Sequence, residues 1–128
     1  ITFNLDLAQK IYGGCDMFLM PSRYEPCGLG QLFAMRYGTV PVVRLTGGLA
    51  DTVKEFDPSS FEGNGFGFYD YSPEELLETL KKAIKAYEDQ RTWSRIVSNA
   101  MEEDFSWKAS ARNYLAVYEK ILEVKGDA

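Results

Sequence analysis

The sequence predicts an α/β fold, in which a Rossmann-like parallel sheet is followed by helices toward the carboxyl end. The first observation is a strand–helix–strand pattern: apolar residues 17–20 and β-branched residues 39–45 flank a helical segment of about three turns. The second is an aromatic, alternating segment at 66–71, which predicts a third strand or extended segment. The third is the helical patterning from residue 72 onward, which is long for so few strands. We therefore expect the second half of a doubly wound domain.

The amino-terminal segment predicts one helix and one strand. Residues 17–20 form an apolar run that is too short for a helix and ends at Pro21, which indicates a buried strand. Before this run, Gly13 and Gly14 end a helical pattern. The apolar residues of that pattern are Leu5, Leu7, Ala8, Ile11 and Tyr12.

The next segment completes a βαβ unit. Residues 29–38 are rich in helix-forming residues and end at Gly38, a residue type that commonly follows the last turn of a helix. Residues 39–45 predict a second strand, parallel to the first and reached by a right-handed crossover. Residues 50–56 predict a short helix, and residues 57–65 a loop rich in glycine, serine, asparagine and proline.

Three helices are predicted after the third strand. Ser72, Pro73 and Glu75 have the spacing of a capping box with proline in the first turn. Thr92 and Ser106 are candidate caps for the two helices that follow. The three apolar stripes comprise Leu76, Leu77, Leu80, Ala83, Ile84 and Tyr87; then Trp93, Ile96, Val97 and Ala100; then Trp107, Ala111, Tyr114, Leu115, Tyr118, Ile121 and Leu122. Their stripe positions predict that both tryptophans pack in the core.

The composition excludes several kinds of chemistry. The 128 residues include no histidine, which excludes Ser-His-Asp, Cys-His and histidine–metal sites. Cys15 and Cys27 are too few for a disulfide framework or a metal cluster, and we expect free thiols in a reducing compartment. A formal net charge of −5 without a basic tract argues against a nucleic-acid partner. No apolar run reaches the roughly 18 residues of a membrane span, so no membrane partner is expected.

Two glycine-containing loops are expected at one edge of the sheet. Residues 22–30 follow the first strand, and residues 44–49 follow the second. Ligands of open parallel sheets bind beyond the carboxyl ends of the strands, which share an edge. The N–H groups at a helix start can bind phosphate, and Gly28 and Gly30 leave that backbone accessible. The alternative is that the glycines only shape turns, since neither loop has an established nucleotide-binding pattern.

Three charged residues belong to this edge. A carboxylate beside a phosphate would be repelled, so we interpret Glu25 as facing sugar hydroxyls or the positive charge of an oxocarbenium-like transition state. A solvated loop residue, or a cap for the following amides, is the alternative. Arg23 and Arg44 are candidates for positive charge near a bound phosphate.

The stretch SRYEPCGLGQLFAMRYGTVPVVRLTGGLADTV strongly resembles the nucleotide-sugar-binding domain of bacterial glycogen synthases and plant starch synthases. The combination of E-P-C-G-L and T-G-G-L-x-D-T-V at this separation is highly specific. The resemblance is dense over residues 10–54 and continues more loosely through NGFGFYDYSPEEL and FSWKASARNYLAVYEKIL. It implies a GT-B fold and retaining transfer of glucose from ADP-glucose to the non-reducing end of an α-1,4-glucan. It implies no metal or other cofactor, since ADP-glucose is the donor substrate.

The resemblance also implies roles for the loop residues. Glu25 would be the active-site carboxylate that contacts the donor glucose and supports its anomeric centre. The residues implied to lie against the glucose and the distal phosphate, or elsewhere near the donor, are Gly28, Leu29, Gly30, Thr46, Gly47 and Gly48.

Four further positions are read through the resemblance. Cys27 lines the donor pocket in the family, and we expect a packing thiol rather than a nucleophile. Phe3 stands where relatives place an aromatic residue against adenine, with ordinary core packing as the alternative. Gly30 replaces a threonine of many relatives, so a hydroxyl contact is lost. Phe33 stands where the wider superfamily has a second glutamate, which argues against sucrose-phosphate-synthase-like enzymes.

We interpret residues 1–128 as a single, partial donor-binding domain, with the amino-terminal domain of the family and its K-x-G-G-L-type motif absent. The expected partners are ADP-glucose or ADP, and an α-1,4-glucan through that amino-terminal domain. The expected location is the bacterial cytoplasm or the plastid stroma. By itself, the chain is expected not to transfer glucose. Two alternatives remain: a GT-B enzyme that uses UDP-glucose, and a non-catalytic α/β interaction module.

Overall fold

A three-stranded parallel sheet lies at the centre of the computed structural model, which describes residues 4–126. Its strands are β1 (Met17–Met20), β2 (Val40–Arg44) and β3 (Phe66–Phe68), in the spatial order β1-β2-β3. The middle strand pairs in parallel with both neighbours, with Leu19 opposite Val42 and Val42 opposite Phe66. The predicted fold class, a Rossmann-like parallel sheet followed by helices, is confirmed.

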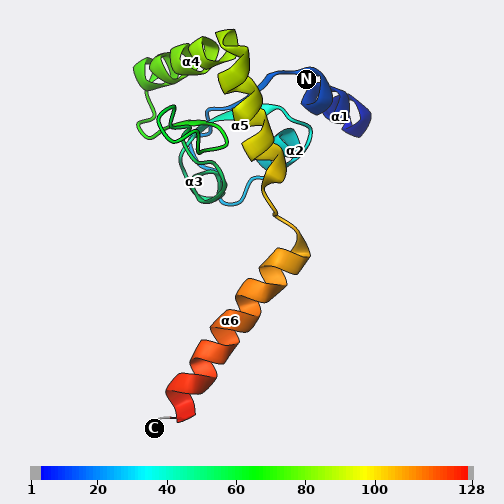
Figure 1. The fold of residues 1–128 in the computed structure, drawn as a ribbon, viewed down its shortest axis with the longest axis vertical. Helices are drawn as coiled ribbons and strands as arrows, with labels where there is room; N and C mark the ends of the chain where they lie inside the picture. Colours follow the sequence, from blue (N-terminus) through cyan, green and yellow to red (C-terminus); the bar gives the residue numbers. More distant parts are fainter. Residues whose placement is uncertain (1–3, 127–128) are drawn as a thin grey trace.

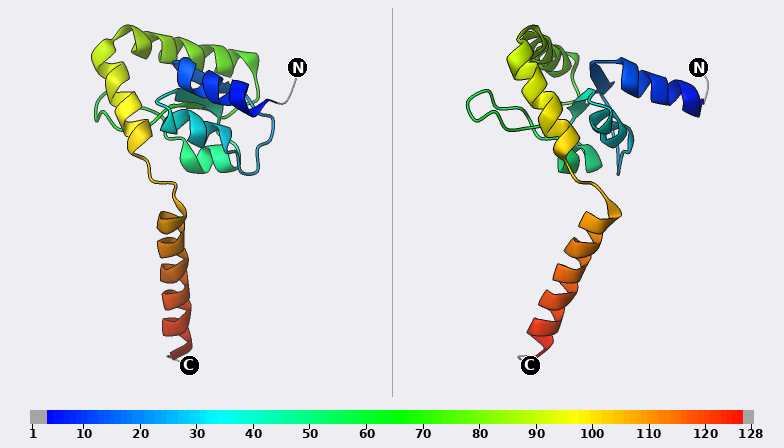
Figure 2. Two further views of the ribbon diagram at one scale, coloured as in Figure 1. Left: turned by 90° about the vertical axis from the view of Figure 1, so that its right-hand side faces the viewer. Right: turned by 45° about the vertical axis from the view of Figure 1, so that its right-hand side comes forward.

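Helices cover both sides of the sheet. Figure 2 shows α1 and α2 on one side of the strands and α4 and α5 on the other, while α6 extends away from the body (Figure 1). Helix α2 packs on β1 and β2, and α4 packs on β2 and β3. The helices are α1 (Leu5–Gly14), α2 (Gly30–Arg36), α3 (Gly48–Thr52), α4 (Pro73–Glu88), α5 (Gln90–Glu102) and α6 (Trp107–Gly126).

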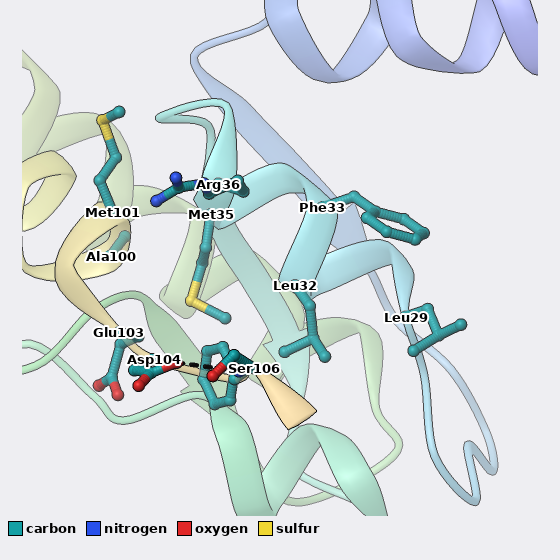
Figure 3. A pocket seen from close by; sticks show the side chains of 11 residues that line it. Leu29, Leu32, Phe33, Met35, Arg36, Ala100, Met101, Glu103, Asp104 and Ser106 are labelled. Carbon is teal, nitrogen blue, oxygen red and sulfur yellow. Dashed lines mark hydrogen bonds between the residues drawn. The ribbon is translucent and has the colours of Figure 1, made fainter. Parts of the chain in front are cut away.

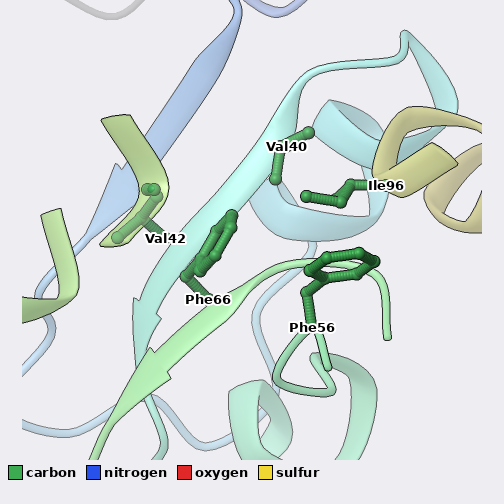
Figure 4. Close-up of a cluster of buried hydrophobic side chains, with 6 residues drawn as sticks. Val40, Val42, Phe56, Phe66 and Ile96 are labelled. Carbon is green, nitrogen blue, oxygen red and sulfur yellow. The ribbon is translucent and has the colours of Figure 1, made fainter. Parts of the chain in front are cut away.

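The core forms around the middle strand. Residues 40–43 of β2 are all buried, because helices cover both faces of the sheet. Val40 and Val42 join a cluster with Phe56, Phe66 and Ile96, shown in Figure 4. This cluster connects β2 and β3 with α5 and, through Ala83, with α4.

Most predicted elements are confirmed, with one shift in the middle of the chain. The short helix predicted at 50–56 instead begins at Gly48 and ends at Thr52. From Val53 the backbone is extended, and the Phe56 N–H donates to the Gly65 carbonyl. Val53 and Phe56 are buried, so the residues that read as the second half of a helix are extended chain packed into the core.

Two of the three helix caps predicted for α4, α5 and α6 are confirmed. The Ser72 hydroxyl accepts from the Glu75 N–H, as predicted, but the Ser72 N–H donates to Asp70 rather than to the Glu75 side chain. The Ser106 hydroxyl accepts from the Ala109 N–H at the start of α6. Thr92 is not a cap: α5 begins earlier, with Asp89 as the N-cap.

The apolar stripe of α6 has no partner among the described residues 4–123, whose side chains the structure places. Trp107 is 86% exposed, so the prediction that it packs in the core is wrong, whereas Trp93 is partly buried against the main cluster. The predicted apolar stripe of α4 is only partly buried: Ala83 is buried, but Leu77 and Ile84 are about half exposed. Amphipathic spacing predicted these helices correctly but did not predict which faces would be covered.

The core assignment is tested by truncating one isoleucine on each side of the burial boundary. Ile96 is fully buried, and Ile96→Ala is expected to lower the free energy of unfolding by about 2–5 kcal/mol, through lost apolar contact and the resulting cavity. Ile84→Ala removes the same atoms from an exposed position on α4 and should change it by less than about 1 kcal/mol. Urea denaturation of both variants measures the difference, and equal losses would contradict this core.

The cap of α5 predicts a pH dependence. The Thr92 hydroxyl and the Arg91 N–H donate to the Asp89 carboxylate, and these hydrogen bonds lower the pKa of Asp89 below its ordinary 3.8. A carboxylate with a lower pKa in the folded state stabilises the fold fully above its unfolded pKa, and this contribution is lost as the pH falls below it. We expect Asp89→Ala to lower the Tm at neutral pH, and the difference in Tm between the unmodified chain and this variant should become smaller below pH 3.8. Glu88→Ala, at the adjacent exposed position, is the control, and a difference that stays constant in acid would refute this account.

Candidate functional site

The two predicted loops lie against each other at the carboxyl edge of the sheet. The Gly48 N–H donates to the carbonyl oxygens of Glu25 and Pro26, at 3.2 Å each. A Cβ added to Gly48 would lie 1.9 Å from the Cys27 carbonyl oxygen, and one added to Gly47 would lie 2.1 Å from the Glu25 carbonyl oxygen. Only glycine permits this approach, because any side chain at either position would overlap the backbone of the first loop.

A buried glutamine supports the first loop from inside. Gln31 is fully buried, and its Nε2 donates to the Gly28 carbonyl at 2.9 Å and to the Thr52 hydroxyl at 3.1 Å. Thr52 in turn donates to the Gly48 carbonyl at 2.7 Å, so the contact reaches the second loop. Sequence reasoning missed Gln31, although it shares helical spacing with the buried residues Ala34 and Met35. A polar glutamine on the apolar face of this helix could have indicated a side chain with buried hydrogen-bond partners.

Arg44 also connects the loop to the sheet. Its Nη1 donates to the Arg23 carbonyl at 2.8 Å and its Nε to the Tyr69 carbonyl at 2.9 Å, with the guanidinium 5.6 Å from the centre of the Tyr71 ring. These contacts hold residue 23 beside the segment that follows β3. The side chain of Arg44 therefore has a structural role, in addition to its predicted place at this edge, while Arg23 is exposed.

The other predicted residues of this edge are open to solvent to different degrees. Glu25 and Thr46 are partly buried, and Leu29 is 60% exposed. Cys27 is exposed, so its thiol is not packed as expected. Phe3 lies outside the described residues.

Gly30 lies against the aromatic pair of Tyr12 and Phe18, and Gly28 has a left-handed backbone conformation. A Cβ added to Gly30 would lie 3.2 Å from the Phe18 ring and 3.4 Å from the Tyr12 hydroxyl oxygen, which is tight but not prohibitive. Gly28 has a φ of +70°, and its missing Cβ leaves room for the amide of Gln31. Glycine is therefore favoured at the two positions for different reasons: limited space beside Tyr12 and Phe18 at Gly30, and backbone conformation at Gly28.

Two cavities border the segment between β1 and α2. One of about 490 Å³ runs from Leu29 along α2 to the end of α5; Leu32 and Met35 line it from α2, and the 103–106 segment lines its other side (Figure 3). There, hydrogen bonds from Ser106 lower the pKa of Asp104. The other, of about 290 Å³, lies between Pro21 and the segment that follows β3. Neither cavity is lined by Glu25 or Thr46.

Among residues 4–126, no group of three or more histidine, cysteine, aspartate or glutamate side chains is placed to hold a metal ion. In the same range, no helix combines the length and the apolar character that a membrane crossing requires.

Comparison with known proteins identifies the family of this chain. The sequence model described as "Glycosyl transferases group 1" matches residues 3–100. The chain belongs to this glycosyltransferase family. The glycogen synthases of Kosmotoga olearia and Thermotoga maritima are 66% identical over 122 residues and 59% identical over 127 residues, covering 95% and 98% of this chain and 26% of each relative.

Solved structures agree with this family assignment. The catalytic domain of starch synthase IV from Arabidopsis thaliana, bound to ADP and acarbose, has a TM-score of 0.83 and 38% identity over 94% of this chain and 25% of that one. The resemblance to glycogen and starch synthases and the GT-B type of fold are confirmed. A sucrose-phosphate synthase from Thermosynechococcus elongatus, at 23% identity and a TM-score of 0.61, shares the fold alone. The glycosyltransferase chain spans about a quarter of the length of the curated relatives it matches.

The loop contact is tested by adding one methyl group to a glycine of this glycosyltransferase. Gly48→Ala should lower the free energy of unfolding by about 1–3 kcal/mol or more, because the new Cβ overlaps the Cys27 carbonyl. Gly14→Ala is the matched control: nothing lies within 4 Å of the added Cβ at the end of α1, so stability should be unchanged or raised. Thermal unfolding compares the two, and a Gly48→Ala chain as stable as the control would show that the loops are not in contact.

Proposed function

We propose that this chain is the nucleotide-sugar-binding part of a retaining glucosyltransferase that moves glucose from ADP-glucose to the non-reducing end of an α-1,4-glucan. The observation that carries the proposal is the apposition of Glu25 and Pro26 with Gly47 and Gly48 at the carboxyl edge of the sheet. The curated relatives are named glycogen synthases, and the starch synthase IV structure holds ADP and acarbose; both support this donor and acceptor class.

The proposed chemistry is electrostatic. Loop N–H groups near Gly28 and Leu29 would donate to the diphosphate as it leaves, and Arg23 would add positive charge at the same edge. The Glu25 carboxylate would contact the glucose and stabilise the positive charge that develops at its anomeric carbon. No histidine is present in the sequence, so this scheme assigns no step to an imidazole base, and we propose that neither a metal nor another cofactor is required.

The donor specificity is tested by titration. The 128-residue chain is titrated with ADP, ADP-glucose and UDP-glucose by calorimetry. We expect ADP and ADP-glucose to bind at least about tenfold more tightly than UDP-glucose, which corresponds to about 1.4 kcal/mol of discrimination. Tighter binding of UDP-glucose would support the alternative GT-B donor, and binding of none of the three would support a non-catalytic interaction module.

The role of Glu25 is tested in a chimera. This chain replaces the matching quarter of the Thermotoga maritima glycogen synthase, to which it is 59% identical, and glucose transfer from ADP-glucose to glycogen is measured. Glu25→Gln is expected to lower kcat by about 10²–10³-fold, the size typical for loss of one electrostatic group at a transition state. Glu88→Gln, at an exposed position on α4, should leave kcat unchanged. Equal rates for the two variants would remove Glu25 from the reaction, and transfer by the 128-residue chain alone would contradict the expectation that it is inactive by itself.

A further inference from the structure

The first loop presents its carbonyl groups inward. Over residues 25–28, the Gly48 N–H contacts the carbonyls of Glu25 and Pro26, and the Gln31 amide contacts those of Cys27 (3.5 Å) and Gly28 (2.9 Å). The described peptide bonds are all trans, and a trans peptide points its C=O and its N–H in opposite directions. The N–H groups of Cys27, Gly28 and Leu29, which follow the carbonyls of Pro26, Cys27 and Gly28, therefore point away from Gln31 and Gly48.

Those N–H groups are available to a ligand. No described residue accepts a hydrogen bond from the N–H of Cys27, Gly28 or Leu29. Cys27 and Leu29 are exposed, so these donors lie at the surface of the loop rather than in the core. Their common direction follows from the inward carbonyls, and hence from the groups that hold those carbonyls.

Gln31 is held in one orientation by its surroundings. The carbonyls of Cys27 and Gly28 can only accept, and the Thr52 hydroxyl already donates to the Gly48 carbonyl, so all three require a donor. The two N–H bonds of the Gln31 Nε2 serve the Gly28 carbonyl at 2.9 Å and the Thr52 hydroxyl at 3.1 Å, with the Cys27 carbonyl farther away at 3.5 Å. This leaves the Gln31 Oε1 buried without a partner among the described residues. A buried acceptor without a partner is unfavourable. Reversing the amide would be worse, because it would place the Gln31 oxygen against the carbonyl oxygens of Cys27 and Gly28. The amide is therefore locked, and the loop with it.

We propose that Gln31 and Thr52 are positioning residues for the donor diphosphate. They hold the loop carbonyls inward, so that the N–H groups of Gly28 and Leu29 are fixed as donors toward the phosphates before the ligand arrives. Neither side chain contacts the ligand in this scheme: Gln31 is fully buried, and Thr52 acts through Gln31 and the Gly48 carbonyl. The inference rests on the proposed function and extends it to two residues that stand behind the site.

The test separates the diphosphate from the rest of the nucleotide. The unmodified chain, Gln31→Met and Thr52→Val are titrated with ADP and with adenosine, which lacks the phosphates, by NMR. Both substitutions keep the approximate side-chain volume and remove the donor or hydroxyl of the network. We expect each to weaken ADP binding by about tenfold or more, the effect of one misplaced donor to a charged group. Adenosine affinity should stay within about twofold, because its binding uses no donor that this network orients.

Two variants control for general destabilisation. Thr52→Ser keeps the hydroxyl and should retain ADP affinity, whereas Thr79→Val removes the hydroxyl of a buried threonine on α4 and should also retain it. If Gln31→Met does not fold, as judged by urea denaturation, the Thr52→Val and Thr52→Ser pair still decides the question.

Three outcomes count against the inference, and they differ in meaning. ADP affinity unchanged in Thr52→Val refutes the positioning role, as does an equal loss of ADP and adenosine affinity, which would show a purely structural effect. An unmodified chain that binds neither compound refutes the proposed function, and the inference with it.

Discussion

The site depends on one backbone contact, in which the Gly48 N–H meets the carbonyl groups of Glu25 and Pro26. This contact joins the loop after β1 to the loop after β2, and it exists because neither Gly47 nor Gly48 has a side chain to hold the loops apart. Parallel pairing of β1 and β2 brings the two loops to the same edge, but it does not bring them into contact. A side chain at either glycine would overlap the backbone of the first loop, and the two loops would be held apart.

The polar groups around this contact differ in what they can offer a ligand. The guanidinium of Arg44 already donates to two backbone carbonyls and lies near an aromatic ring, so its charge helps to hold the loop. The amide of Gln31 is likewise engaged from within. Fixed charges and buried amides therefore shape the backbone, and in the proposed scheme the N–H groups of the loop and the exposed Arg23 bind the anion. Such an arrangement lowers the entropic cost of binding, because a donor group that is held before binding loses little conformational entropy when the ligand arrives.

The rest of the fold serves to place that edge. The cluster of Val40, Val42, Phe66 and Ile96 fixes the middle strand between helices, and Phe56 from the extended chain after α3 adds to the same cluster. Helix α6 stands apart from this core with its apolar residues exposed, and the glycogen and starch synthase relatives are about four times as long as this chain. Among residues 4–123, the large apolar side chains of α6 are exposed and do not belong to the core clusters around the sheet.

The sequence by itself determined the features that depend on neighbours along the chain. The βαβ order, the Ser72 and Ser106 caps and the glycine spacing of the loops follow from local patterning, and the motif of residues 22–53 identified the family. Only the tertiary structure decided that α3 ends at Thr52, that Trp107 is exposed, that Cys27 is not packed and that Gln31 supports the loop. The physical reason is that burial and long-range hydrogen bonds depend on which segments meet across the fold. The spacing of residues in one segment carries no information about its partner.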